Sequence, residues 1–214
     1  MYRQYFTRST IAALAAEFLG TMGLVMVALV MFNTTAVSFF VGTSVAVALG
    51  LMVLMFGPIS GAHLNPAITF GLWTARRIAS LKALGYIVVQ LLAGLASWQL
   101  YEYLSGKTLS TKVVPWNTTV WLAEVIGTFV LGLAFAAAIA KGFELLNSAL
   151  MLAGALFIGI LIAATASAGL LNPAIALGLR TFNTTYVLGP LVGAVLGANL
   201  YTLLFAPIAK SKRS

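Results

Sequence analysis

The tripeptide Asn-Pro-Ala occurs twice in this chain of 214 residues, as Asn65-Pro66-Ala67 and as Asn172-Pro173-Ala174. Asparagine is favoured at a helix N-cap, and proline suits the first helical position because an N–H there would have no intrahelical partner. Each tripeptide therefore predicts the start of a helix. The amino end of a helix carries free N–H groups and roughly half a positive charge. The chemistry expected at both places is hydrogen-bond donation and repulsion of cations.

Two glutamates stand out because they lie inside long apolar stretches. Glu17 and Glu124 each belong to an Ala-Glu-x-x-Gly-Thr motif. An unpaired carboxylate inside a membrane span costs at least a few kcal/mol, so each must have a partner or a function. One interpretation makes the two glutamates proton-coupling groups of a transporter. The other makes them acceptors for N–H groups of the extended segments that precede the Asn-Pro-Ala motifs.

His63 is the only histidine and lies two residues before Asn65. We expect it to anchor the segment before the first Asn-Pro-Ala motif, near the cytoplasmic mouth. A role in pH-dependent gating is the alternative.

The two pairs of motifs share one spacing. Ala16–Thr21 recurs at Ala123–Thr128, and Leu64–Leu72 recurs at Leu171–Leu179, each 107 positions later. A common offset of half the chain length indicates an internal duplication, with repeats 1–107 and 108–214 forming a single membrane domain. Because each repeat holds three spans, the second copy is inverted relative to the first.

The elements that must position these motifs are membrane helices. The chain is 61% hydrophobic and only 7% charged, whereas soluble domains carry about 25% charged residues. An apolar stretch of about 20 residues crosses the hydrocarbon core. We predict six such spans: 11–31, 36–56, 83–104, 119–140, 147–165 and 185–207.

The apolar runs after the Asn-Pro-Ala motifs are too short to cross. Each is about ten residues long, which is about 15 Å of helix. The predicted fold class is therefore an all-α integral membrane protein with six transmembrane helices, two re-entrant half-helices and an inverted 3+3 repeat. Short, interrupted segments at matched places in an inverted repeat indicate a transport site.

Basic residues are distributed unequally between the two sides of the predicted topology. One side carries both termini and the following cations: Arg3, Arg8, Arg76, Arg77, Lys82, Lys141, Lys210, Lys212 and Arg213. The other side carries Lys107, Lys112 and Arg180. This bias predicts cytoplasmic termini in a cell membrane, and it accounts for the net charge without a nucleic-acid partner.

Three Asn-Thr-Thr sequences begin at Asn33, Asn117 and Asn183, on the predicted outer side. They fit the glycosylation pattern, but we expect capping of helices to explain them.

Catalysis and metal binding are not expected. The chain has no cysteine, no aspartate and one histidine, which leaves no constellation for an enzyme, no thiol-ligated metal site and no cofactor site.

With its paired Asn-Pro-Ala motifs, its Ala-Glu-x-x-Gly-Thr motifs and Ser60-Gly61-Ala62-His63 before the first half-helix, the whole chain resembles the major intrinsic proteins, the aquaporins and glycerol facilitators. The resemblance implies a homotetramer with a pore in each protomer. It implies passage of water or small uncharged solutes, with protons and ions excluded at the paired half-helix ends. It also favours the anchoring role for the two glutamates.

The resemblance is weakest at the outer constriction. The family's water-selective members place an aromatic residue, a histidine, a small residue and an arginine there; the corresponding residues here are Val45, Ile160, Gly169 and Ile175. The constriction should therefore be apolar. The aspartate that accompanies the arginine in glycerol facilitators is absent too. A channel mainly for glycerol, ammonia or another small neutral solute thus remains open beside a water channel, and so does an ion-coupled transporter that uses Glu17 and Glu124.

Overall fold

The computed structural model describes residues 7–113 and 115–206, and within them six helices are long and apolar enough to cross a membrane. They are α1 (Arg8–Thr34), α2 (Ser38–Ser60), α4 (Ser80–Ser105), α5 (Thr118–Lys141), α6 (Leu145–Ala163) and α8 (Thr184–Leu200). All six predicted spans are confirmed, although the last one finishes as a π-helical turn, η2 (Tyr201–Phe205). Residue 207 of that predicted span lies outside the described residues, as do the cations Arg3, Lys210, Lys212 and Arg213.

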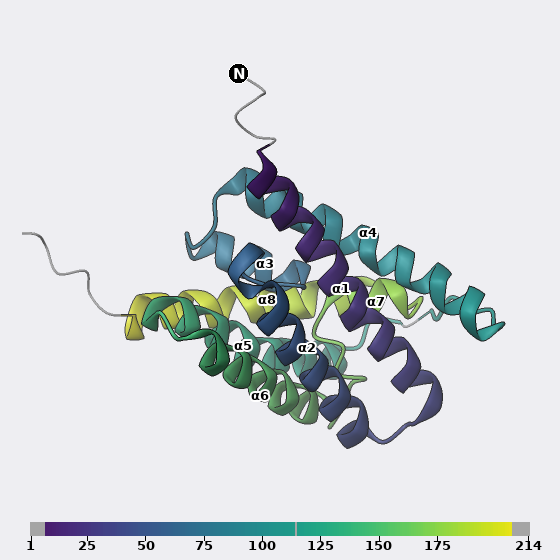
Figure 1. Ribbon diagram of the computed structural model, residues 1–214. Helices are drawn as coiled ribbons and strands as arrows, with labels where there is room; N and C mark the ends of the chain where they lie inside the picture. The colour runs from purple at the N-terminus through teal and green to yellow at the C-terminus, as the bar shows by residue number, and fades with distance from the viewer. Residues whose placement is uncertain (1–6, 114, 207–214) are drawn as a thin grey trace, which may run out of the picture.

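Two further helices are too short to span a bilayer and begin at the prolines of the Asn-Pro-Ala motifs. They are α3 (Pro66–Thr74) and α7 (Pro173–Gly178). Figure 1 shows both among the long helices, with α3 and α7 on opposite sides of the centre of the molecule. The predicted architecture of six spans and two half-helices is confirmed.

The second half-helix is shorter than predicted, with six residues instead of about ten. Arg180 adopts a left-handed conformation with φ of 59° directly after the C-cap Leu179 and so stops α7. In the first copy the same conformation occurs later, at Arg76 with φ of 58° after the C-cap Ala75. Because α8 starts early in the second copy, the chain has to turn before a longer half-helix can form.

Each half-helix packs against the last long helix of the other half: α3 against α8, and α7 against α4. Both contacts depend on a glycine. A Cβ atom on Gly71 of α3 would come within 2.6 Å of the carbonyl oxygen of Ala194, and one on Gly94 of α4 within 2.6 Å of that of Ala174. The two halves therefore hold each other's half-helices in place.

Helices α5 and α8 approach each other closely along three glycines, Gly189, Gly193 and Gly197, as their four-residue spacing predicts. A Cβ atom on Gly189 would lie 2.8 Å from the Cβ of Glu124, and one on Gly197 would lie 2.8 Å from the backbone nitrogen of Leu133. This packing fixes the position of the helix that carries Glu124.

Helix capping explains two of the three Asn-Thr-Thr sequences. Asn117 and Asn183 are the N-caps of α5 and α8, and each side-chain oxygen accepts two backbone N–H groups of its helix. The expectation is wrong for Asn33, which lies inside the last turn of α1 and donates its amide to the carbonyl of Leu29.

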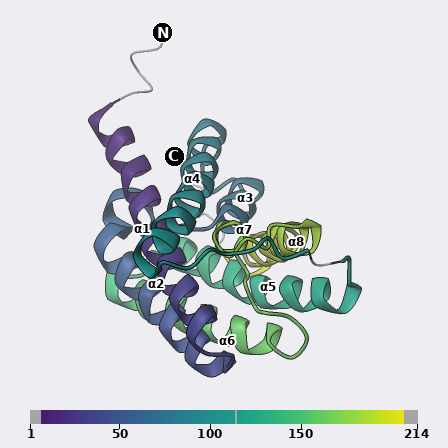
Figure 2. The same cartoon turned by 90° about the vertical axis from the view of Figure 1, so that its right-hand side faces the viewer.

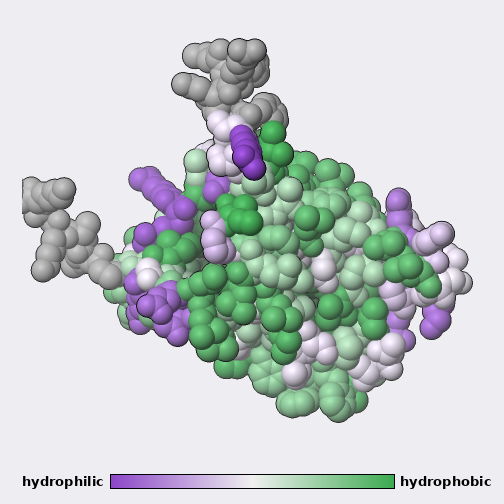
Figure 3. Space-filling model, viewed as in Figure 1, coloured by the Kyte–Doolittle hydropathy of each residue, from purple (hydrophilic) through white to green (hydrophobic). Residues whose placement is uncertain are grey.

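The surface divides into an apolar band and two polar ends. Figure 3 shows hydrophobic residues across the middle of the face in view and hydrophilic residues at two opposite ends. Every long helix has exposed large hydrophobic side chains. A surface of this kind is stable in a lipid bilayer, so the protein is an integral membrane protein.

Candidate pore at the meeting point of the half-helices

Asn65 and Asn172 cap the two half-helices and also link them. The Oδ1 of Asn65 accepts the backbone N–H of Ala67 at 2.8 Å, and that of Asn172 accepts the N–H of Ala174 at 2.9 Å. Each Nδ2 donates to the segment before the other half-helix, from Asn65 to the carbonyl of Leu171 at 2.8 Å and from Asn172 to the carbonyl of Leu64 at 2.9 Å. A side-chain amide has two N–H donors, so each asparagine keeps one for another partner.

The two leucines whose carbonyls accept these hydrogen bonds have an unusual backbone conformation. Leu64 has φ of 52° and Leu171 has φ of 53°. A residue with a side chain rarely adopts this left-handed region, which costs roughly 1–2 kcal/mol. Two matched residues in that conformation must be held there by their surroundings, and the surrounding contacts are hydrogen bonds to Glu17 and Glu124 together with two glycines.

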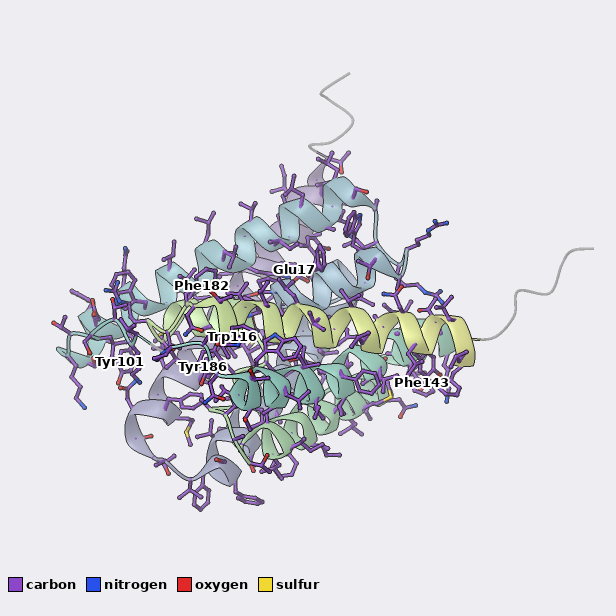
Figure 4. The ribbon with its side chains drawn as sticks, turned by 180° about the vertical axis from the view of Figure 1, so that it is seen from behind. Glu17, Tyr101, Trp116, Phe143, Phe182 and Tyr186 are labelled. Atoms are coloured by element: carbon purple, nitrogen blue, oxygen red, sulfur yellow. The ribbon has the colours of Figure 1, made fainter. Side chains whose placement is uncertain are left out.

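Glu17 holds the segment before α3. Its Oε1 accepts the hydroxyl of Ser60 at 2.7 Å and the backbone N–H of His63 at 2.9 Å. Its Oε2 accepts the backbone N–H of Leu64 at 2.8 Å and the amide of Gln90 at 2.7 Å. The side chain is fully buried, and Figure 4 shows it in the interior of the helix bundle. Four donors therefore surround this carboxylate.

Glu124 holds the segment before α7 in the same manner. It accepts the backbone N–H of Leu170 at 3.0 Å, the backbone N–H of Leu171 at 2.7 Å and the hydroxyl of Ser167. Ser167 and Ser60 are 107 positions apart, as are the two glutamates. No side chain equivalent to Gln90 donates to Glu124 among the described residues, because α8 has Gly197 where the repeat offset would place it.

The glycine of each Ala-Glu-x-x-Gly-Thr motif makes room for a left-handed leucine. A Cβ on Gly20 would lie 2.6 Å from Cδ2 of Leu64, and a Cβ on Gly127 would lie 2.7 Å from Cδ2 of Leu171. The motif therefore combines a carboxylate that accepts the loop N–H groups with a gap for the leucine between them. Sequence reasoning identified the glutamate and missed the purpose of the glycine.

A narrow cavity of about 10 Å³, the inner cavity, lies at the meeting point of the half-helices. This is about the room that one water molecule needs. Its lining consists of Leu24, Leu49, His63, Asn65, Leu131, Phe135, Leu156, Asn172 and Ile175. Leu24 and Leu131 are 107 positions apart, and so are Leu49 and Leu156. These leucines were not predicted: the repeat offset pairs them, but it does not tell which leucines face the cavity.

A wider cavity of about 510 Å³, the outer cavity, opens on the side of the loop between α1 and α2. Ile160 lines it together with residues of that loop and the start of the segment before α7, including Ser167 and Ala168. The two cavities have no lining residue in common.

The four residues expected at the outer constriction are only partly together. A Cβ on Gly169 would lie 3.1 Å from the carbonyl oxygen of Ile160, so these two are in contact. Ile175 lines the inner cavity and Ile160 the outer one. Val45 is buried but lines neither of these cavities. The four positions are apolar or glycine, but they do not line one cavity together.

The ring of His63 lines the inner cavity on the side of α3. It packs edge-to-face against Tyr86 and Phe135, and its Nδ1 lies 3.2 Å from the hydroxyl oxygen of Thr69. Thr69 in turn exchanges hydrogen bonds with Gln90, which donates to Glu17. Polar side chains thus connect the histidine to the buried carboxylate in the first half of the chain.

Arg180, the first arginine after the second Asn-Pro-Ala motif, packs away from this centre. Its guanidinium lies 3.9 Å above the ring of Trp98 and donates to the hydroxyl of Thr111 at 2.6 Å. Its carbonyl accepts the backbone N–H of Lys112 at 2.8 Å. Figure 2 shows the connection from α4 to α5 running across this end of the molecule near α7 and α8. Arg180 therefore stabilises the loop between α4 and α5 and does not line the inner cavity.

No group of three or more histidine, cysteine, aspartate or glutamate side chains that could hold a metal ion occurs within the described residues. The polar side chains that line the inner cavity are the amides of Asn65 and Asn172 and the imidazole of His63. They can form hydrogen bonds with a passing molecule and order it.

Comparison with known proteins agrees with this architecture. The family model described as "Major intrinsic protein" matches residues 4–201. Aquaporin AqpM of Methanothermobacter marburgensis is 31% identical over 190 residues, covering 77% of this chain and 76% of that protein. Aquaporin Z of Photorhabdus laumondii is 30% identical over 229 residues, covering 90% of this chain and 97% of that protein.

A solved structure has the same fold. The aquaglyceroporin of Plasmodium falciparum superimposes with a TM-score of 0.70 over 93% of this chain and 96% of that one, at 23% sequence identity. The family model, the relatives and the arrangement of the half-helices all agree: this chain belongs to the major intrinsic protein family.

Proposed function

We propose that this protein is a passive transmembrane channel for water and other small uncharged molecules, with the inner cavity as its narrow centre. One observation carries the proposal: the asparagines that cap the two half-helices both line one cavity of about 10 Å³. A molecule the size of water fits there and can accept a hydrogen bond from the free N–H of either amide. The leucines and Phe135 on the remaining wall form no hydrogen bonds, so the molecule is not held strongly.

Exclusion of ions follows from the same geometry. The amino ends of α3 and α7 each carry partial positive charge, and the two asparagines bring these ends together. A cation at the centre would lose its hydration shell and meet two positive helix ends at once, which is an electrostatic barrier of the kind that excludes protons and cations in such pores.

Apolar residues in the linings of the two cavities favour a second candidate substrate within the same class. Ile160, Gly169 and Ile175 provide no side-chain donor or charge. A neutral solute such as ammonia or glycerol is therefore not rejected by a charge there, while water gains no hydrogen bond and can be slowed by dewetting. Relative permeability to water, ammonia and glycerol distinguishes the two candidates.

An ion-coupled transporter is the less well supported alternative. Such a protein would use Glu17 and Glu124 to carry protons. Both carboxylates already accept hydrogen bonds from loop N–H groups and serine hydroxyls, and neither lines the two cavities. Their contacts are those of anchors for the segments before the half-helices.

The test is a stopped-flow osmotic shock on vesicles that contain the purified protein. We expect water or ammonia to cross much faster than in empty vesicles, without saturation and without an ion gradient. Leu131→Trp fills the inner cavity and should remove the added permeability. Leu196→Trp adds the same side chain on an exposed position of α8 and should not. Unchanged permeability to water, ammonia and glycerol would contradict the proposal.

We further propose a homotetramer in the cell membrane with both termini on the cytoplasmic side. Arg8, Arg76, Arg77 and Lys141 support this orientation, because the described cations are more numerous at this end than at the end with Lys107, Lys112 and Arg180.

The number of chains in the detergent-solubilised protein can be counted by native mass spectrometry, and any number other than four contradicts the tetramer.

A further inference from the structure

A basic pocket lies apart from the pore, where α3 ends and α4 begins. Its volume is about 310 Å³, and it is lined by Trp73, Arg76, Arg77, Ile78, Ala79 and Ser80. The lining residues run from the end of α3 to the first residue of α4. It contributes nothing to either cavity of the candidate pore.

Acidic partners for the two arginines are scarce. Arg76 is exposed, and the Nε of Arg77 is buried with no hydrogen-bond partner among the described residues. The chain has four acidic residues. Glu17 and Glu124 are buried at the segments before the half-helices, and Glu102 lies at the far end of α4. Only Glu144 is at this end of the molecule, so the pocket has an excess of positive charge.

Backbone and hydroxyl donors add to the two guanidinium groups. The N-cap of α4, Ala79, forms no side-chain capping hydrogen bond, so the N–H groups of the first turn of this helix have no side-chain acceptor at the N-cap. The indole of Trp73 donates to the hydroxyl oxygen of Ser80 at 3.0 Å, which leaves the proton of that hydroxyl available. An anionic oxygen in the pocket can therefore interact with arginine, hydroxyl and backbone donors together.

An apolar surface continues from the pocket into the membrane region. Leu81, Leu84 and Val88 are 56%, 60% and 47% exposed. Their spacing of three and four residues places them on one face of α4. Trp73 is partly exposed beside the pocket, and tryptophan is enriched where the polar and apolar parts of a bilayer meet.

We propose that this pocket binds an anionic phospholipid of the adjacent leaflet. The headgroup phosphate lies between Arg76, Arg77 and the start of α4, and an acyl chain lies along Leu81, Leu84 and Val88. The charge of the pocket selects an anionic headgroup, and the apolar face selects a lipid over a free anion. Lys82 is not included, because its ammonium lies over the ring of Tyr86, 5.2 Å from the ring centroid.

Fluorescence quenching of Trp73 by brominated lipids tests this proposal. A parent with Trp98→Phe, Trp116→Phe and Trp121→Phe keeps Trp73 as its single tryptophan. It is placed in vesicles of phosphatidylcholine with phosphatidylglycerol as the minor lipid, with bromine on one lipid or the other. A cation at a membrane surface strengthens binding to anionic lipid by about 1 kcal/mol, or about five-fold. We therefore expect a preference for phosphatidylglycerol of about five-fold or more.

Two matched double variants show which end of the molecule causes the preference for phosphatidylglycerol. Arg76→Gln with Arg77→Gln should abolish it, so that the two lipids bind about equally. Lys107→Gln with Lys112→Gln removes the same charge at the opposite end and should leave it unchanged. Equal quenching by the two lipids, or loss of the preference with the lysine pair alone, would overturn the proposal.

Two further measurements distinguish a lipid site from a site for free anions and from an effect of the tryptophan substitutions. Excess inorganic phosphate at constant ionic strength should not reduce the preference, and a loss would show a site for free anions instead. Native mass spectrometry of the protein with all four tryptophans gives a readout that does not depend on the substitutions. We expect retained phosphatidylglycerol that the arginine pair removes; phosphatidylcholine retained to the same extent would contradict the proposal.

Discussion

Asn65 and Asn172 differ from ordinary helix caps because each also donates to the segment before the other half-helix. The oxygen of each amide satisfies its own helix, and the nitrogen joins the two halves of the chain. These contacts are possible only when both half-helices begin at the same place. The position of each asparagine therefore depends on the other one.

Replacing Ile175 with arginine tests the apolar constriction at the scale of one residue. Ile175→Arg introduces a positive charge and hydrogen-bond donors beside the inner cavity. We expect permeability to ammonia and glycerol to fall relative to permeability to water in stopped-flow measurements. Ile175→Met changes the shape without adding charge and should leave the ratio close to that of the parent. An unchanged ratio in the arginine variant would mean that Ile175 does not take part in selection.

Replacing Glu17 with glutamine tests the anchoring of the first segment. Four donors surround the carboxylate, and glutamine offers one acceptor oxygen, so at least two donors lose their partner. We expect a loss of stability of about 3 kcal/mol, measured as a lower melting temperature in detergent, with reduced water permeability. Glu144→Gln at the exposed N-cap of α6 is the control, since Glu144 forms no side-chain capping bond. Full stability with loss of ion-coupled flux would favour the transporter instead.

At the scale of helices, the half-helices are held by close contacts between backbones. Gly71 and Gly94 bring α3 to α8 and α7 to α4, and the glycines of α8 bring it against α5. Lipid gives little hydrophobic drive for helices to associate, so such contacts depend on small residues that allow dense packing. Glycine is required at these positions because the neighbouring backbones are too close to leave room for a Cβ atom.

Helix packing can be tested with a pair of glycines that differ only in their surroundings. A Cβ on Gly193 would approach the carbonyl of Val125 and lie 3.0 Å from the backbone nitrogen of Phe129. Gly193→Ala should cost about 1–3 kcal/mol through overpacking. Gly154 of α6 has nothing within 4 Å of such a Cβ, so Gly154→Ala should stabilise the protein by about 0.5–1 kcal/mol. Melting temperatures that shift equally would contradict this assignment of the contact.

The two ends of the whole molecule carry different cavities. The outer cavity is lined by Ala168 and the loop between α1 and α2, while the basic pocket and the starts of α1 and α4 are at the other end. Figure 4 shows Tyr101, Trp116, Phe182 and Tyr186 toward one end and Phe143 toward the other. Aromatic residues near both ends fit the two interfaces of a bilayer.

Cysteine chemistry tests the orientation, because the chain contains no cysteine. Mercuric chloride should leave the permeability of the parent unchanged. Ala168→Cys places a thiol in the outer cavity, and mercury should then reduce permeability. In intact cells a membrane-impermeant thiol reagent should label Ala168→Cys without lysis. Labelling only after lysis would mean that the orientation is reversed, and inhibition of the parent would mean that mercury acts without a thiol.

The sequence by itself determined the six spans, the two helix starts at Asn65 and Asn172, and the presence of carboxylates that need partners. These features depend on local properties: apolar length against bilayer thickness, and the fit of asparagine and proline to the first turn of a helix. The common offset of 107 positions added the inverted arrangement. The role of Val45, Ile160, Gly169 and Ile175 as a selectivity constriction stays a prediction.

Only the tertiary structure decided which side chains face the centre and where the chain turns away from it. Leu24, Leu49, Leu131 and Leu156 line the inner cavity because of how each helix is rotated about its own axis, and an apolar span offers no polar face from which to predict that rotation. Similarly, the left-handed conformation of Arg180 ends α7 early, and the guanidinium of Arg180 packs on the ring of Trp98. These outcomes depend on contacts between residues far apart in the chain, which local sequence pattern does not contain.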